Sequence, residues 1–403
     1  MKSGSFRKII AFILSFISLS PVLIAQSNIR DSLLFQNRQR QYIVHLPPAY
    51  NDQEPLALVI VLHGGSGNLN SVQNFTNMNP VSNANRFLVL YPQGFGPSGM
   101  GGFTWADGRG TSADKLGIDD VGFINHLLDQ VIQDFAVDES RIYLCGFSNG
   151  GFLTQKIACQ MNERLAAIAS LGSSQGVDQI LSCNPERPLP TLILTGTADP
   201  LVPYEGGPME GDVPDVISSR ELLDFWIQNN ACRNELDSLN LPDTDTTDNS
   251  NVSVFEWDQC DCEAKVKHLR INGGGHTWPG VELENVEVIG GETNEDIQAS
   301  VELWKFFRDF QLCTDLVTSV EGPILATPQV EIFPNPSQET VLIKSSTEIL
   351  RIELVDLRGQ VIVSQDANQS LFGLDLQDVS AGTYFLKMKE KGGQEYAKVL
   401  LVE

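Results

Sequence analysis

The sequence has little positive charge, few histidines, and only one long hydrophobic run. Of its 403 residues, 27 are basic and 51 are acidic, which gives a formal net charge of −24. This charge repels phosphate backbones and anionic lipid surfaces, so we expect no nucleic-acid partner. No stretch after the N-terminal run is apolar enough to cross a bilayer, so we also expect no stable membrane insertion. The hydrophobic content of 42% is still ample for a buried core.

The single hydrophobic run occupies residues 9–25 and follows three basic residues. A basic start, an apolar middle and a small residue, Ala25, at the end are typical of a secretory signal peptide. We therefore predict that residues 1–25 are removed on export and that the mature protein is extracellular or on the cell surface. A membrane anchor is the alternative, but the run is short for a bilayer span.

Cysteine is scarce as well, with seven residues in the whole chain. In an exported protein this number predicts disulfides with one thiol left over. Cys145 is the expected free thiol because it lies in an apolar run and should be buried. The bridges that we predict are Cys159 with Cys183, and Cys232 with Cys260 or Cys262.

From about residue 40, short apolar runs alternate with helical patterns. Residues 56–62 are almost all apolar, as in a strand buried on both faces. Residues 119–135 carry apolar side chains at helical spacing, with Asp119 or Asp120 placed as the N-cap. This alternation predicts an α/β fold with a mostly parallel sheet and helices on both faces. The further strands expected are 87–91, 141–145, 166–171, 191–195 and 266–271, and the further helices are 150–162, 216–229 and 297–310.

The pattern changes after Cys313, where strands and turns replace helices. Residues 314–328 are predicted to be a linker, and residues 329–403 contain no histidine, cysteine or tryptophan. In this segment apolar residues recur at every second position, as at Tyr384 and Leu386, which is typical of half-buried strands. We predict a catalytic domain over residues 26–313 and a small C-terminal all-β sandwich that carries no visible chemistry.

Residues 146–150, Gly-Phe-Ser-Asn-Gly, match the pattern G-x-S-x-G between a predicted strand and a predicted helix. The glycines allow the tight strand-to-helix turn on which a nucleophilic serine is held. This context predicts that Ser148 is a nucleophile. A serine hydroxyl is a weak nucleophile at neutral pH, so a base must lie within hydrogen-bond reach.

The base can be found by elimination, because the sequence has only five histidines. Four of them are set aside by their positions: His45 is expected in an N-terminal strand, His63 at the end of a strand, His126 in the middle of a helix and His268 inside a strand. His276 alone lies in a glycine-rich loop after the last strand, where the chain order Ser, Asp, His puts the base. Asp199, in the loop after the strand at 191–195, is the predicted acid. We interpret the alternatives, Asp178 and Asp224, as ordinary solvated charges.

The oxyanion that forms during acyl transfer needs fixed donors, usually backbone N–H groups. We predict the N–H of Asn149, directly after the serine, and that of Gly65, with Ser66 as the alternative to Gly65. Trp278, two residues after the base, and Trp105 are candidates for the substrate pocket, although a tryptophan more often serves packing. Nothing indicates a metal or an organic cofactor.

Four motifs make the chain resemble the polyhydroxybutyrate depolymerase/feruloyl esterase family of secreted α/β-hydrolases. They occupy residues 63–65, 146–151, 196–204 and 273–280. The resemblance implies an α/β-hydrolase fold whose triad is the Ser, Asp and His of these motifs. The chain departs from many members at residues 105–109, where Trp-Ala-Asp-Gly-Arg replaces a Cys-containing loop.

Residues from about 328 onward resemble the type A C-terminal sorting domain of type IX secretion. The resemblance rests on Phe-Pro-Asn-Pro at 333–336, Val-Asp-Leu-Arg-Gly at 355–359 and Ala-Gly-Thr-Tyr at 381–384. It implies that the secretion machinery is a partner of this domain.

These features together predict a secreted serine carboxylic ester hydrolase that works through an acyl-enzyme without a cofactor. We expect a polymeric substrate, with feruloyl or acetyl esters of polysaccharides preferred because Trp278 beside the base suits a planar acyl group. A polyhydroxyalkanoate depolymerase is the main alternative. A serine peptidase and a non-catalytic polysaccharide-binding protein are less favoured.

Overall fold

The computed structural model describes most of the chain between residues 27 and 402. The described residues are 27–313 and 330–402, without 49, 98–101, 210–213, 282–289, 334–336, 338–339, 357–359 and 392–394. The predicted signal peptide and linker lie outside them. The chain divides into two compact units, with the boundary between residues 316 and 317.

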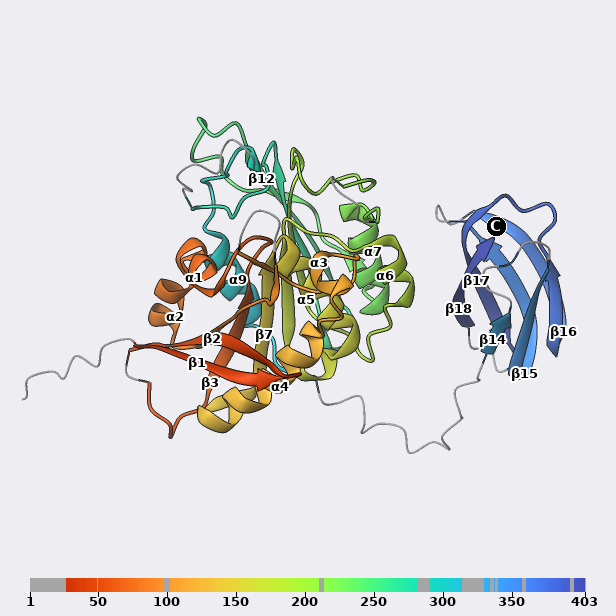
Figure 1. Ribbon diagram of the computed structural model, residues 1–403. Coiled ribbons are helices and arrows are strands. Elements are labelled where there is room, and N and C mark those ends of the chain that lie inside the picture. The colour runs from red at the N-terminus through yellow and green to blue at the C-terminus, as the bar shows by residue number, and fades with distance from the viewer. Residues whose placement is uncertain are drawn as a thin grey trace, which may run out of the picture. The chain divides into compact units, whose positions relative to one another are not determined.

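The first unit is built on an eleven-stranded, mostly parallel sheet (Figure 1). Its strand order is β1-β2-β4-β3-β7-β8-β9-β13-β12-β10, with β11 also paired to β12. All neighbours from β4 to β13 are parallel, and antiparallel strands extend the sheet at both edges. The strands are β1 Ser27–Phe35, β2 Arg38–Leu46, β3 Leu56–Leu62, β4 Leu88–Pro92, β7 Val137–Phe147, β8 Ala167–Leu171, β9 Thr191–Gly196, β10 Asn234–Glu235, β11 Leu239–Asn240, β12 Asn251–Asp258 and β13 Val266–Asn272, and a separate short pair is β5 Gly96–Pro97 with β6 Phe103–Thr104.

Helices cover both faces of this sheet. On one face pack α4, α5 and α7, and on the other pack α1, α2 and α9. The described helices are α1 Leu69–Thr76, α2 Met78–Asn85, α3 Ser112–Lys115, α4 Asp120–Asp134, α5 Asn149–Gln160, α6 Val177–Ser182, α7 Ser219–Asn229 and α9 Ala299–Phe307.

The central position of β3 in the sheet explains why its sequence is apolar throughout. Leu58 and Ile60 belong to the core on one face, whereas Val59 and Val61 belong to the core on the other. Successive side chains of a strand point to opposite faces, so a central strand covered twice has no solvent-facing position. The predicted α/β fold, a mostly parallel sheet with helices on both faces, is thereby confirmed.

The sequence left Asp119 and Asp120 as alternatives for the N-cap of α4, and the structure decides between them. Asp119 is the cap, because its carboxylate accepts the N–H of Gly122 at 2.8 Å. Asp120 lies inside the helix and is fully buried in an ion pair with Arg40 at 2.5 Å.

Sequence reasoning missed two of the longer strands of the first unit, β1 and β12, as well as the two-residue strands β5, β6, β10 and β11. Strand β1 is an edge strand whose side chains are mostly exposed, so its sequence lacks the apolar periodicity on which the prediction relied. No strand was predicted at residues 251–258, where the structure has β12.

The second unit consists of five antiparallel strands with a core of their own. Strand β15 pairs with β16 along its length, and on its other side it pairs first with β14 and then with β17. The predicted strands at 341–344 and 349–355 are one strand with an irregularity between Lys344 and Ile349. The core includes Leu386 and Met388, so the predicted all-β character is confirmed. The strands are β14 Val330–Phe333, β15 Thr340–Val355, β16 Val361–Asp375, β17 Gly382–Glu390 and β18 Glu395–Val402.

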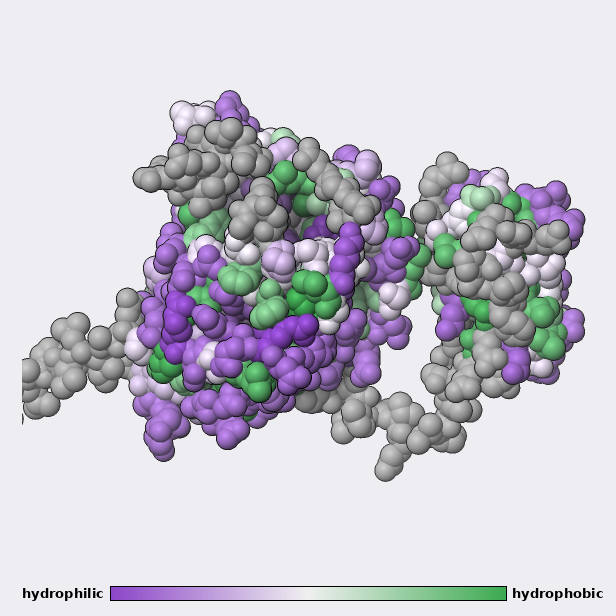
Figure 2. All heavy atoms as spheres, viewed as in Figure 1, coloured by the Kyte–Doolittle hydropathy of each residue, from purple (hydrophilic) through white to green (hydrophobic). Residues whose placement is uncertain are grey.

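Hydrophilic residues cover much of the face of the first unit that is seen in Figure 2. Within the described residues, no helix combines the length and the apolar character that a membrane span requires.

Candidate active site

Ser148 lies on a sharp bend between the end of β7 and the start of α5. Its backbone has φ 54° and ψ −123°, a conformation that residues with a side chain rarely adopt. The bend is tight because glycines flank it. A Cβ on Gly146 would lie 2.2 Å from the carbonyl oxygen of Gly150, and a Cβ on Gly150 would lie 2.5 Å from that of His63. Both positions therefore require glycine, as the motif predicts.

Asp199 and His276 follow the neighbouring parallel strands β9 and β13. Nδ1 of His276 lies 2.7 Å from Oδ2 of Asp199, and the two side chains are 6% and 3% exposed. The other carboxylate oxygen of Asp199 accepts the N–H groups of Leu201 and Val202, each at 2.8 Å. Because a carboxylate only accepts, Nδ1 carries a proton, so it is Nε2 that has the free lone pair when the ring is neutral. This arrangement suits a general base.

Ser148 and His276 both lie next to the bend at residues 171–172. The N–H of Ser148 donates to the carbonyl of Leu171 at 2.9 Å. Gly172 has φ 53°, and a Cβ there would lie 3.2 Å from the ring of His276. Between the side chains of Ser148 and His276, both of which the structure describes, there is no hydrogen bond. Such bonds often tighten only when substrate binds.

The loop after β3 forms a tight turn beside the start of α5. The N–H of Gly67 donates to the carbonyl of Gly64 at 3.1 Å, with Gly65 and Ser66 in between. Gly65 faces α5, since a Cβ on it would lie 3.7 Å from Cβ of Asn149. The N–H groups in the first turn of a helix have no partner within the helix, and Asn149 is the first residue of α5. Both predicted oxyanion donors are thus neighbours.

His63 shapes this turn, a role that sequence reasoning missed. Its Nε2 accepts the N–H of Gly94 at 2.9 Å, so Nδ1 is protonated and donates to the carbonyl of Gly64 at 2.7 Å. Burial lowers the pKa of His63 to about 4, so the ring is neutral near neutral pH.

The two tryptophans predicted to line the pocket are both fully buried, and this part of the prediction is corrected. Trp105 is 0% exposed and packs against the ring of His63, with centroids 4.7 Å apart and the ring planes tilted by 32°. Trp278 is also 0% exposed and packs edge-on against Phe75 and Phe147. Neither indole presents a surface to a substrate, because both lie in the hydrophobic core.

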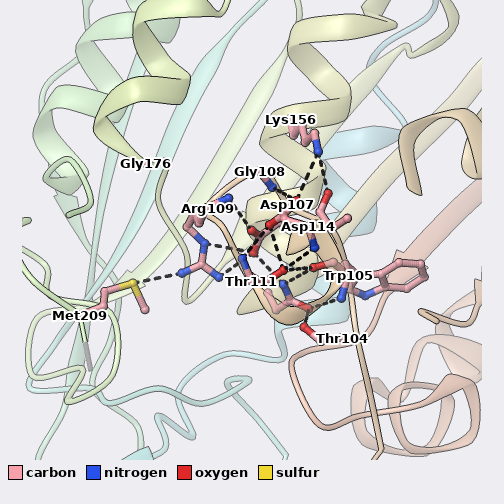
Figure 3. Close-up of polar contacts among 12 residues, drawn as sticks. Thr104, Trp105, Asp107, Gly108, Arg109, Thr111, Asp114, Lys156, Gly176 and Met209 are labelled. Atoms are coloured by element: carbon pink, nitrogen blue, oxygen red, sulfur yellow. Dashed lines mark hydrogen bonds and ion pairs between the residues drawn. The ribbon is translucent and has the colours of Figure 1, made fainter. Parts of the chain in front are cut away.

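The structure adds a polar cluster that the sequence did not indicate. Asp107 and Arg109 form a buried ion pair at 2.6 Å, and the carboxamide of Asn149 donates to the same carboxylate at 2.6 Å. Figure 3 shows this cluster, with the guanidinium of Arg109 extending towards Met209. No local pattern could have revealed it, because the partners lie about forty residues apart.

Three disulfides brace the first unit. The structure joins Cys159 to Cys183 and Cys232 to Cys260, as the sequence suggested, and adds a bridge between Cys262 and Cys313. Cys145 is the free, buried cysteine. In the described part of the chain, no group of three or more His, Cys, Asp or Glu side chains is arranged to hold a metal ion.

Comparison with family models gives two matches. Residues 40–179 match the family described as esterase PHB depolymerase. Residues 331–403 match the secretion system C-terminal sorting domain. The first match contains the turn after β3 and Ser148, whereas Asp199 and His276 lie beyond its end.

Curated relatives are esterases by name. The chain is 27% identical to the bifunctional acetylxylan esterase/xylanase XynS20E of Neocallimastix patriciarum, over 64% of this chain and 34% of that protein. It is 28% identical to feruloyl esterase B of Piromyces equi, over 59% of this chain and 42% of that protein. The chain therefore spans less than half the length of both. A solved acetyl xylan esterase from Aspergillus awamori is similar with a TM-score of 0.43 and 14% identity, over 62% of this chain and 94% of that one. By its two family matches, the chain contains an esterase domain of the PHB depolymerase family and a secretion system C-terminal sorting domain.

Proposed function

We propose that this protein is an exported carboxylic ester hydrolase with Ser148 as nucleophile, His276 as general base and Asp199 as the acid that orients it. The observation that carries the proposal is the strained bend at Ser148 beside the buried pair of His276 and Asp199. The matched esterase family and the names of the relatives support the same class of reaction.

The mechanism follows from the arrangement of protons. Nε2 of His276 takes the proton of Ser148 as Oγ attacks the ester carbonyl, and Asp199 stabilises the imidazolium that forms. The N–H groups of Gly65 and Asn149 bind the oxyanion of the tetrahedral intermediate. Collapse of the intermediate expels the alcohol, which receives its proton from His276. Water, activated by His276, then attacks the acyl-enzyme and releases the carboxylic acid.

The proposed substrates are feruloyl or acetyl esters of polysaccharides. The relatives support this choice, since two of them are named as acetylxylan and feruloyl esterases. Trp278 gives no support, because its indole is fully buried. A polyhydroxyalkanoate depolymerase is the second candidate, favoured by the match of residues 40–179 to the PHB depolymerase family.

Export is proposed from the two ends of the chain. Residues 1–25 would act as the signal peptide and residues 329–403 as the domain that the secretion machinery recognises, with residues 314–328 as the linker. The match of residues 331–403 to the sorting domain supports this division.

A fluorophosphonate probe tests the nucleophile directly. Labelling should map to Ser148, disappear in Ser148→Ala and persist in Ser182→Ala, which changes a serine of α6. An unlabelled wild-type protein would contradict the proposal. A panel of methyl ferulate, acetylated xylan, polyhydroxybutyrate oligomers and casein then separates the substrates. Activity only on the oligomers would favour the depolymerase, and activity only on casein would favour a peptidase.

A further inference from the structure

We propose that residues 104–109, here called the strap, set the distance between the two proposed oxyanion donors, and that Asp107 and Trp105 are positioning residues for them. The inference rests on the proposed function and deepens it. The strap contacts His63, directly before the turn that carries Gly65, and Asn149 at the start of α5, and these residues come from separate segments of the chain. Its contacts are buried and directional, so they define a geometry rather than merely filling space.

Trp105 attaches the strap to the turn. Its indole N–H donates to the carbonyl of His63 at 2.8 Å, and its ring packs at a tilt against the imidazole of the same residue. One residue before the strap, the N–H of Phe103 donates to the carbonyl of Gly67 at 3.0 Å. The turn that carries Gly65 is thus held at both ends by residues 103–105.

The carboxamide of Asn149 attaches the strap to α5. Its oxygen accepts from the hydroxyl of Thr104 at 2.8 Å and from the N–H of Trp105 at 2.7 Å. Its nitrogen donates to the carbonyl of Trp105 at 3.2 Å and to the carboxylate of Asp107 at 2.6 Å. Every donor and acceptor of this amide is occupied, so the backbone of Asn149 cannot rotate without breaking buried hydrogen bonds.

Asp107 is held by Arg109, and contacts with side chains of α5 hold Arg109 and Ala106. The carboxylate receives the backbone N–H and two guanidinium nitrogens of Arg109 at 2.6–3.0 Å. The guanidinium also lies over the ring of Phe152, 3.5 Å from its centroid, and Lys156 donates to the carbonyl of Ala106 at 2.7 Å. Because Arg109 balances the charge of Asp107, the carboxylate can orient Asn149 without placing net negative charge beside the oxyanion.

The strap matters for catalysis because it would fix how far the two donors lie from the oxyanion. Oxyanion donors act when they lie about 2.7–3.1 Å from the developing charge, and a misplacement of roughly 1 Å costs about 10²-fold in rate. Loosening the strap should therefore lower kcat and leave KM nearly unchanged, since the donors bind the transition state more strongly than the ground-state ester.

Two double variants of equal charge and similar shape isolate the hydrogen bond of Asp107. Asp107→Asn with Arg109→Met keeps an acceptor for Asn149, whereas Asp107→Leu with Arg109→Met removes it. With p-nitrophenyl acetate as substrate, we expect the first to keep kcat within about threefold of wild type. The second should lose roughly 10- to 100-fold in kcat and a similar factor in affinity for a boronic acid, which mimics the tetrahedral intermediate.

A second pair of variants tests Trp105 if the leucine variant does not fold. Trp105→Phe keeps a ring on His63 but removes the donor to its carbonyl. Trp226→Phe is the matched control, because that indole is also 0% exposed and donates to Gln155 at 2.8 Å. We expect kcat to fall about tenfold or more only in Trp105→Phe, while thermal unfolding shows comparable losses in both.

The outcomes separate this inference from the proposed function. Equal kcat in the two double variants, or in the two tryptophan variants, would overturn the role of the strap while wild-type labelling of Ser148 kept the esterase proposal intact. Wild-type protein without fluorophosphonate labelling would instead reject the proposed function itself, and the inference with it.

Discussion

The imidazole of His276 packs against the phenyl ring of Phe147, with ring centroids 4.8 Å apart. Phe147 directly precedes Ser148, so this contact ties the proposed base to the bend that carries the proposed nucleophile. The hydrogen bond between Nδ1 and Asp199 holds the imidazole at its edge. The ring is therefore fixed from two directions, which is the preorganisation that proton transfer requires.

Ser148 should be needed for activity and unfavourable for stability. Its φ of 54° strains any residue with a Cβ, at a cost of about 1–3 kcal/mol. Ser148→Ala and Ser148→Gly should both abolish ester hydrolysis beyond a small residual rate. Ser148→Gly should also unfold at a higher temperature than Ser148→Ala, because glycine tolerates this conformation. Calorimetry of both variants tests the strain, and equal unfolding temperatures would argue against it.

Replacement of Asp199 by asparagine should preserve the fold but fix the wrong tautomer of His276. An asparagine nitrogen facing Nδ1 donates where the carboxylate accepts, so Nε2 would carry the proton and lose its function as a base. We expect kcat to fall by roughly 10⁴-fold at neutral pH. The matched control is Asp224→Asn, which breaks an exposed pair with Arg220 and should retain wild-type kcat. A loss below tenfold in Asp199→Asn would rule out this role.

Two buried histidines should make the protein less stable as the pH falls. Burial lowers the pKa of His63 to about 4 and that of His268 to about 3. Below pH 6.5 the unfolded chain binds protons at both residues and the native state does not. The free energy of unfolding should therefore decrease by up to about 1.4 kcal/mol per pH unit for each histidine, down to pH 4 for His63 and pH 3 for His268. Above pH 6.5 this contribution is complete.

Urea unfolding between pH 7 and pH 4.5 measures the effect. The variant His268→Gln keeps a polar partner for Thr195, which lies 2.9 Å from the imidazole, but cannot titrate. Its stability should depend on pH less steeply than that of the wild type. His126→Gln replaces an exposed imidazole of α4 and serves as the control. Identical slopes for His268→Gln and wild type would refute the assignment.

Cys145 should react with thiol reagents only after unfolding. Its side chain is 0% exposed, and burial raises the pKa of its thiol, so the reactive thiolate is suppressed. A disulfide-exchange reagent should detect no thiol in the native protein and one per chain in denaturant without reductant. Three thiols in denaturant would mean that one of the three bridges does not form.

The sequence revealed the central strands and the four longest described helices, because periodicity and glycine placement are local properties, whereas the shorter helices α1, α2, α3 and α6 were not predicted. The apolar run at 56–62 and the helical spacing at 119–135 correspond to β3 and α4 within a few residues. The edge strand β1 escaped detection, because a strand that pairs along one side and faces solvent needs no apolar pattern. In the second unit, the break that suggested two strands is an irregularity within β15.

The amino-acid sequence by itself determined the alternation of strands and helices, the glycine-flanked Ser148, and His276 and Asp199 as its candidate partners. Each of these depends on neighbours in the chain or on the order of motifs. Only the tertiary structure decided that Trp105 and Trp278 are buried, and that the carboxamide of Asn149 meets Asp107. Burial and hydrogen bonding between distant segments depend on how layers pack, and no local pattern records which side chains that packing encloses.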